Sequence, residues 1–302
     1  MSEQEESLRR HIRRILIALD ASTHSLAALE TAVNLAAALD AQLAGLFVED
    51  INVLRLAELP FVRQVRTLSA VAQPVSRRQI EAELQAQAAR ARRTLLAAAR
   101  QARIPATFRV TRGQVPLEVL AAAVEADLLL LGPISRPLTR RLRVGSTARI
   151  VIARAPHSVL LVQPRPVQSI MVTYDGSPLG QRALATAASL HGVKPAGAGL
   201  VPAQGRSQGR VQDPPLLTVL LVAEEPALAQ QLQEEAAAWL QRWGVTAEYH
   251  WLGLPTVANL VRTVQEASCN LLVLGGERVA LAEEAVQSLL DSVGCSLMLI
   301  RE

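Results

Sequence analysis

Two stretches of the sequence, RILIALDAS at residues 14–22 and SIMVTYDGS at residues 169–177, decide the fold. Each is an apolar run that ends in an acidic residue, Asp20 or Asp175, followed by small turn residues. Ala- and Leu-rich segments with helical spacing follow both stretches. This self-similarity indicates a duplicated module.

Each half also ends in a similar pair of apolar strands, at residues 127–132 and 158–162 and at residues 270–275 and 296–300. Pro164 and Pro166 break any continuing strand between the halves. We therefore expect two modules that form a pseudo-symmetric pair. The first covers residues 1–166 and the second covers residues 167–302.

Strands and helices alternate in the first half, and the second half repeats this order. The expected elements are strand 12–19, helix 23–39, strand 42–48, helix 79–103, strand 106–111, helix 115–126, strand 127–132, helix 146–154 and strand 158–162. Strands that alternate with helices are joined by right-handed crossovers and form a parallel sheet with helices on both faces. The expected fold class is therefore α/β, with two tandem doubly wound parallel-sheet modules.

Two segments interrupt this alternation. Residues 192–215 are rich in Gly, Pro and Gln and are expected to form a mobile loop. Residues 51–74 form an insert that has too many apolar residues for a solvated loop: Leu54, Leu56, Leu59, Phe61, Val62 and Val65. We expect the insert to pack on its own module or on a second copy of the chain; a membrane surface or another partner is the alternative.

Composition limits the class of protein. The 302 residues are 50% hydrophobic and 19% charged, which is too apolar for a disordered chain. No apolar run approaches the roughly 18 to 20 residues that span a bilayer, and the first residues are polar and acidic. Two cysteines form no disulfide framework. We therefore expect a cytoplasmic protein without stable membrane insertion.

Candidate binding residues gather where parallel strands end, because ligands of open α/β sheets bind beyond the carboxyl ends of the strands. Asp20, Val48 and Gly132 close three strands of the first half. A long loop then leads to a helix whose first turn carries Gly145, Ser146 and Thr147. Backbone N–H groups and hydroxyls at a helix N-terminus suit an anion, and the Asp20 carboxylate suits the hydroxyls of a ribose.

Charge in this region also favours an anion. Residues 128–174 contain no acidic side chain and seven arginines: Arg136, Arg140, Arg141, Arg143, Arg149, Arg154 and Arg165. We expect Arg140 and Arg141 to reach phosphate groups. Nucleic acid is not expected, because residues 128–165 contain no aromatic side chain for stacking on bases. Two alternatives stay open: the arginines form a solvated face or a surface for an acidic partner, and Asp20 is only a turn or N-cap residue.

With these motifs in view, the chain resembles the universal stress protein family, as a tandem member, over roughly residues 13–162 and 169–300. The family's nucleotide-binding branch has an aspartate closing the first strand and a loop of pattern G-x2-G-x9-G-[ST]. Here that loop reads Gly132, two residues, Ser135, nine residues, Gly145 and Ser146, with a serine in place of the second glycine.

The resemblance implies two Rossmann-like, adenine nucleotide α-hydrolase-like modules and a set of site residues in the first of them. Ala18, Leu19 and Asp20 would border adenine and ribose, and Val48 would contact the base. Leu131 and Gly132 would line the pocket beside Ser135, whereas Gly145, Ser146 and Thr147 would hold phosphates. In the second module Val222 takes the place of Val48, but the loop after Gly275 is about five residues shorter. It carries Glu283 and Glu284 where Gly145 and Ser146 lie, which predicts a degenerate phosphate loop.

The expected function is therefore a stress-response or regulatory protein that binds an adenine nucleotide in its first module. The expected ligand is ATP, or AMP or ADP, with or without Mg²⁺. A homodimer and an unidentified protein partner are also expected. We expect no enzyme activity beyond slow ATP hydrolysis, because no convincing metal ligands and general base can be named. The alternative is a nucleotide-free interaction scaffold that acts through the insert at residues 51–74 and a dimer surface.

Overall fold

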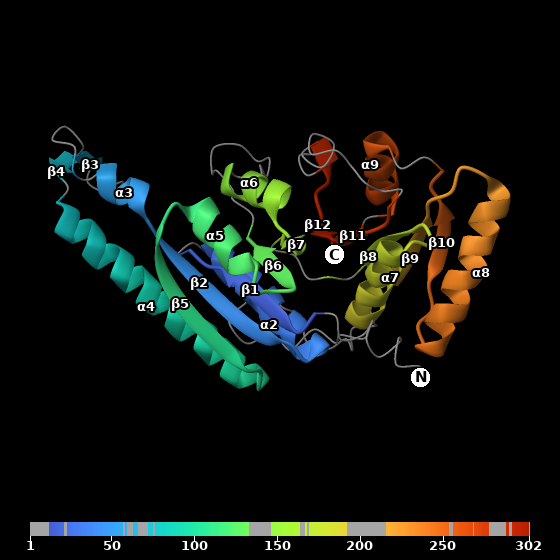
Figure 1. Cartoon of the computed structure of the whole chain (residues 1–302), viewed down its shortest axis with the longest axis horizontal. Helices are drawn as coiled ribbons and strands as arrows, with labels where there is room; N and C mark the ends of the chain where they lie inside the picture. The colour runs from blue at the N-terminus through green and yellow to red at the C-terminus, as the bar shows by residue number, and fades with distance from the viewer. Residues whose placement is uncertain are drawn as a thin grey trace, which may run out of the picture.

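The structure, a computed structural model, describes most of both halves (Figure 1). The described residues are 12–20, 23–56, 58, 63–65, 72–74, 76–132, 146–163, 167, 169–191, 216–253, 256–267, 269–277, 288–289 and 292–301. The expected loop at 192–215 therefore lies outside them.

The elements of the first half alternate as expected, with additional short elements inside the insert. In chain order they are β1 (Arg14–Ala18), α2 (Thr23–Leu39), β2 (Gln42–Asp50), α3 (Ile51–Leu56), β3 (Arg63–Val65), β4 (Ala72–Pro74), α4 (Arg77–Ala102), β5 (Ala106–Gly113), α5 (Val115–Ala123), β6 (Leu128–Leu131), α6 (Ser146–Arg154) and β7 (Ser158–Leu161).

The second half repeats the alternation without the insert. Its elements are β8 (Ser169–Tyr174), α7 (Pro178–His191), β9 (Leu216–Leu221), α8 (Pro226–Arg242), β10 (Glu248–Trp251), α9 (Val257–Glu266), β11 (Leu271–Leu274) and β12 (Ser296–Leu299).

One ten-stranded sheet runs through both modules, in the order β10-β9-β8-β11-β12-β7-β6-β1-β2-β5. Within each module every pairing of this sheet is parallel, and each module follows the same order counted from its own first strand. In the first module the chain adds β2 and β5 on one side of β1 and then crosses over to add β6 and β7 on its other side. The second module does the same around β8, so the strand order reverses between β1 and β6 and between β8 and β11. Each module is therefore doubly wound, and these reversals are where such sheets bind ligands.

The sheet is covered on both faces. Alternate residues of β1 pack to opposite sides: Ile15 and Ile17 face α2 and α4, whereas Leu16 faces α5 and α6. The first of these layers continues in the second module over α7 and α8, and the other continues over α9. Burial on both sides explains why the strands are almost continuously apolar.

The two modules meet through their last strands. β12 pairs antiparallel with β7, and Leu297, Met298 and Leu299 lie opposite Leu161, Leu160 and Val159. We call this junction the module seam. Because strand direction reverses there, the strands of the first module and those of the second have their carboxyl ends at opposite sides of the sheet. β5 and β10 are left as the outer strands.

Helix α4 begins two residues before its expected start at residue 79 because Ser76 caps it. The Ser76 hydroxyl accepts a hydrogen bond from the Gln79 amide at 3.3 Å, and the Gln79 side chain accepts one from the Ser76 amide at 3.1 Å. This reciprocal capping box satisfies two backbone donors that the first turn of a helix leaves unpaired.

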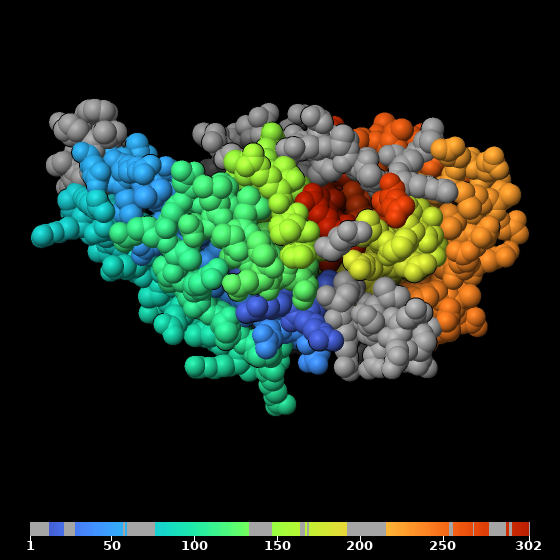
Figure 2. All heavy atoms as spheres, in the orientation of Figure 1, coloured from blue at the N-terminus to red at the C-terminus, as the bar shows by residue number. Residues whose placement is uncertain are grey.

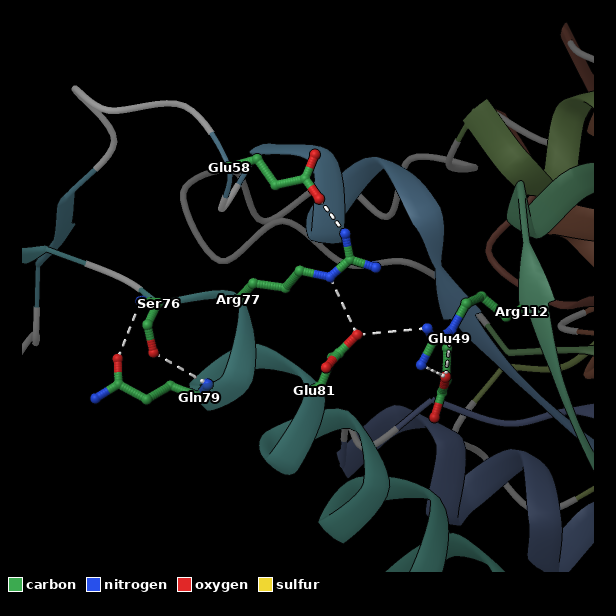
Figure 3. A network of polar contacts seen from close by, with 7 residues as sticks. All are labelled: Glu49, Glu58, Ser76, Arg77, Gln79, Glu81 and Arg112. Carbon is green, nitrogen blue, oxygen red and sulfur yellow. Dashed lines mark hydrogen bonds and ion pairs between the residues drawn. The ribbon is translucent and has the colours of Figure 1, made fainter.

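An ion-pair network holds the start of the insert against the body of the module (Figure 3). Arg112 of β5 donates a hydrogen bond from Nε to Oε2 of the buried Glu49 of β2 at 2.8 Å, and its Nη2 forms an ion pair with the same oxygen at 2.7 Å. Glu81 of α4 accepts from both Arg112 and Arg77, and Arg77 also pairs with Glu58 beyond α3. Leu54 of α3 is buried, so this first part of the insert packs on its own module.

The module seam predicts one stability result. Leu160→Ala removes a side chain that is 2% exposed and should lower the free energy of unfolding by about 2 to 5 kcal/mol, because a cavity remains. Leu117→Ala, at a position 52% exposed, is the control and should change it by less than about 0.5 kcal/mol. Urea unfolding measures both, and similar costs for the two variants would show that the module seam adds little to the core.

Candidate functional site

The sheet register brings the predicted strand residues of the first module to the carboxyl ends of β1, β2 and β6. Ala18 lies beside Leu131 on one side and beside Leu46 on the other. Continuing the β1–β2 register by two residues places Asp20 next to Val48. The amide of Leu19 donates to the carbonyl of Leu46 at 2.8 Å, which keeps this turn against β2.

These residues combine an apolar floor with a polar rim. Leu19 and Leu131 are buried, and Ala18, Val48 and Gly132 are half-buried. Ala18, Val48 and Leu131 belong to the side of the sheet that α5 and α6 cover. Asp20, two residues beyond the end of β1, is exposed. An apolar surface beside an exposed carboxylate can accept a flat ring and hydrogen-bond to hydroxyl groups.

Helix α6 provides the second part of the candidate site. It begins at Ser146, and Thr147 is half-buried in its first turn. The first turn of a helix presents unpaired N–H groups that favour an anion. Gly145 and the other predicted loop residues, Ser135, Arg140 and Arg141, lie outside the described residues.

The equivalent edge of the second module is closed by the protein itself. Asp175 is only 7% exposed, in contrast with Asp20. Its Oδ1 accepts hydrogen bonds from the amide and the hydroxyl of Ser177. The Ser177 hydroxyl also accepts from the amide of Glu277, at 3.2 Å, which ties the loop after β11 to the turn after β8.

Two glycines make this closure possible. A Cβ on Gly276 would lie 2.7 Å from Oδ2 of Asp175, and its φ of +132° is one that L side chains rarely adopt. A Cβ on Gly180 would lie 2.5 Å from Oδ1 of the same carboxylate. Thr173 adds two hydrogen bonds to the backbone of Gly275, at 2.9 and 3.1 Å. Protein backbone therefore surrounds the carboxylate that would have to meet a ligand.

Burial changes the ionisation of Tyr174, the last residue of β8 and the residue before Asp175. Burial, with smaller contributions from Glu235 and Asp175, raises the pKa of Tyr174 to about 12. The phenol therefore remains neutral at physiological pH and adds no charge to the closed edge.

Sequence reasoning missed the role of Ser177, which it took for a simple turn residue. The signal available was the spacing Asp175-Gly176-Ser177, an aspartate followed two residues later by a hydroxyl that can bond back to it. The hydrogen bond from the Glu277 amide to the Ser177 hydroxyl joins residues 100 positions apart, and no local sequence pattern predicts it.

A family model described as the universal stress protein family matches residues 11–163. The chain belongs to the universal stress protein family. None of the curated proteins matches the sequence.

Solved structures extend the comparison to both halves of this universal stress protein. A universal stress protein from Archaeoglobus fulgidus DSM 4304 matches over 97% of each chain, with a TM-score of 0.64 and 16% identity. A functionally unknown protein from Pseudomonas aeruginosa PAO1 covers 98% of this chain and 94% of its own, with a TM-score of 0.55 and 15% identity. At these identities the likeness shows the fold alone, and it supports the tandem arrangement of two modules.

Two further observations bear on ligands and membranes for this universal stress protein. In the described part of the chain, no group of three or more His, Cys, Asp or Glu side chains is arranged to hold a metal ion. None of the helices described is both long and apolar enough to cross a bilayer.

The closed edge of the second module predicts a glycine requirement. Gly276→Ala should lower the free energy of unfolding by about 1 to 3 kcal/mol, because a methyl group there meets the Asp175 carboxylate in a strained backbone conformation. Gly294→Ala is the matched control, since a Cβ at Gly294 has nothing within 4 Å. Denaturant unfolding compares them, and equal stability of the two variants would contradict the close packing at Asp175.

Proposed function

We propose that this universal stress protein binds an adenine nucleotide, preferably ATP, in its first module and acts as a regulatory protein of the stress response. The observation that carries the proposal is the contrast between two equivalent carboxylates. Asp20 is exposed beside half-buried apolar residues, whereas Asp175 is enclosed by Ser177 and Gly276. Family membership supports the proposal, and so does the position of Ala18, Val48 and Leu131 on one side of the sheet near the ends of their strands.

Each part of the proposed site has a chemical role. The Asp20 carboxylate accepts hydrogen bonds from ribose hydroxyls, and charge-assisted bonds of this kind are stronger than neutral ones. Val48 and Ala18 offer apolar contact to the base. The first turn of α6, with Ser146 and Thr147, receives phosphates through backbone N–H groups and hydroxyls. In this proposal Gly132, Ser135 and Gly145 shape the loop between them, and Arg140 and Arg141 neutralise phosphate charge.

The proposal assigns no nucleotide to the second module. A ligand there would have to break the hydrogen bonds that Ser177 makes with Asp175 and Glu277. Breaking them would leave polar groups without partners unless the ligand replaced every bond. The acidic residues Glu283 and Glu284, predicted at the phosphate positions, would add repulsion.

The second candidate function is an interaction scaffold that needs no nucleotide. Val53 and Leu56 of α3 favour it, because they are 38% and 53% exposed on the insert, which lies at one end of the molecule in Figure 1. A homodimer through this surface belongs to the same proposal. The nucleotide content of the purified protein separates the two candidates, since a scaffold would contain none and would bind none when ATP is added.

The contrast between the two aspartates gives a direct test. Calorimetry with ATP should yield about one site per chain. Asp20→Ala should weaken ATP by roughly 10- to 100-fold through the loss of charge-assisted hydrogen bonds. Asp175→Ala is the matched control and should leave affinity unchanged. Two equal sites, or equal losses for both variants, would contradict the assignment of the nucleotide to the first module.

The loop arginines give a second test. Replacing Arg140 and Arg141 together by Ala should cost about 1.5 to 3 kcal/mol of ATP binding and leave adenosine almost unaffected, because adenosine has no phosphate. The control replaces the adjacent pair Arg92 and Arg93, exposed on α4, by Ala. If both nucleotide and nucleoside weaken equally, or if the control pair has the same effect, the loop arginines serve another purpose.

A further inference from the structure

The last described residue of the chain contacts the helix that carries the proposed phosphate site. Arg301 follows β12 in the second module, and its guanidinium donates to two carbonyls at the end of α6 in the first module. Nη2 donates to the carbonyl of Ile152 at 2.6 Å, and Nη1 donates to that of Ala155. In Figure 2 the red C-terminal residues lie directly against the yellow-green residues of this region.

These contacts satisfy a requirement of the helix. The last four carbonyls of an α-helix have no partner within it, and a positive charge near them is favourable. The planar guanidinium fork reaches two carbonyls at once, which fixes the direction of the final turn. Burial lowers the pKa of Arg301, but an arginine stays protonated in proteins, so the charge remains in place.

The arrangement is asymmetric between the modules. At the module seam, the amide of Arg301 donates to the Ser158 hydroxyl at 3.1 Å, and the amide of Gln163 donates to the Ser296 hydroxyl at 2.9 Å. Gln163 thus occupies the position in the first module that Arg301 occupies in the second. The backbone contacts are alike on both sides, but only one side supplies a guanidinium.

Helix α6 is suited to pass this constraint to its other end. It has nine residues, so Ser146 lies roughly 12 Å along the helix axis from Arg154, its last residue. Ala148, Val151 and Ile152 form its buried side in the core that it shares with α5. A change of direction at the last turn therefore displaces the N–H groups of the first turn.

We infer that the second module, through Arg301, positions helix α6 and thereby sets the affinity of the first module for the phosphates of its ligand. This inference rests on the proposed function. It makes Arg301 a positioning residue that touches no ligand, and it gives the module without a nucleotide a role in binding by the other module.

The test compares Arg301→Gln, which removes the charge, with Arg301→Lys, which keeps it. Arg301→Gln should weaken ATP roughly 2- to 30-fold in calorimetry and leave adenosine within about twofold, because base and ribose are held by β1 and β2. Arg301→Lys should recover part of the ATP affinity. Gln163→Ala, the matched change on the other side of the module seam, should match the wild type for both ligands.

A second measurement needs no nucleotide. Amide hydrogen exchange in α6 should be faster in Arg301→Gln than in the wild type, with exchange in α5 unchanged. Equal ATP affinity of Arg301→Gln and wild type would overturn the inference, as would unchanged exchange in α6 or equal losses of ATP and adenosine. Failure of the wild type to bind ATP would overturn the proposed function instead, and with it the effect on affinity, while the exchange data would still decide whether Arg301 holds α6.

Discussion

The antiparallel pairing of β7 with β12 is the interaction on which the rest of the structure depends. It converts two five-stranded sheets into one and makes the helix layers on both faces continuous. Because it reverses strand direction, it places the carboxyl ends of the strands of the two modules at opposite sides of the sheet. It also brings Arg301 within hydrogen-bond distance of α6, so the second module contacts the first at a point remote from its own closed edge.

Much of the fold could be predicted from the sequence because the deciding signals are local. Apolar strands such as Leu128–Leu131, which is buried on both faces, alternate with helical spacing, and this pattern leaves few topologies. The short elements of the insert could not be predicted, since apolar content alone does not distinguish α3 from the β3–β4 pair. Helix α4 begins at Arg77, two residues before the start that its apolar spacing predicts, because Ser76 and Gln79 form a capping box.

The candidate site, like the fold, has some features that local sequence signals predict and others that they do not. Asp20, Val48 and Gly132 could be brought together from the sequence, because the carboxyl ends of parallel strands meet at one edge. The closure of the second site and the contact of Arg301 with α6 depend on residues about 100 or more positions apart. Such contacts follow from tertiary packing, which no local sequence pattern specifies. The acidic loop of the second module pointed to a lost phosphate site, but the enclosure of Asp175 is a separate physical reason.

The module seam and the short connector affect how the pairing of the two modules depends on protein concentration. If the modules were separate chains, their association would depend on protein concentration, and dilution would dissociate them. Here a connector of a few residues between Leu161 and Ser169 replaces that equilibrium with an effective concentration, roughly in the millimolar range for a short linker. The pairing of the two modules therefore depends less on protein concentration than the pairing of two separate single modules would.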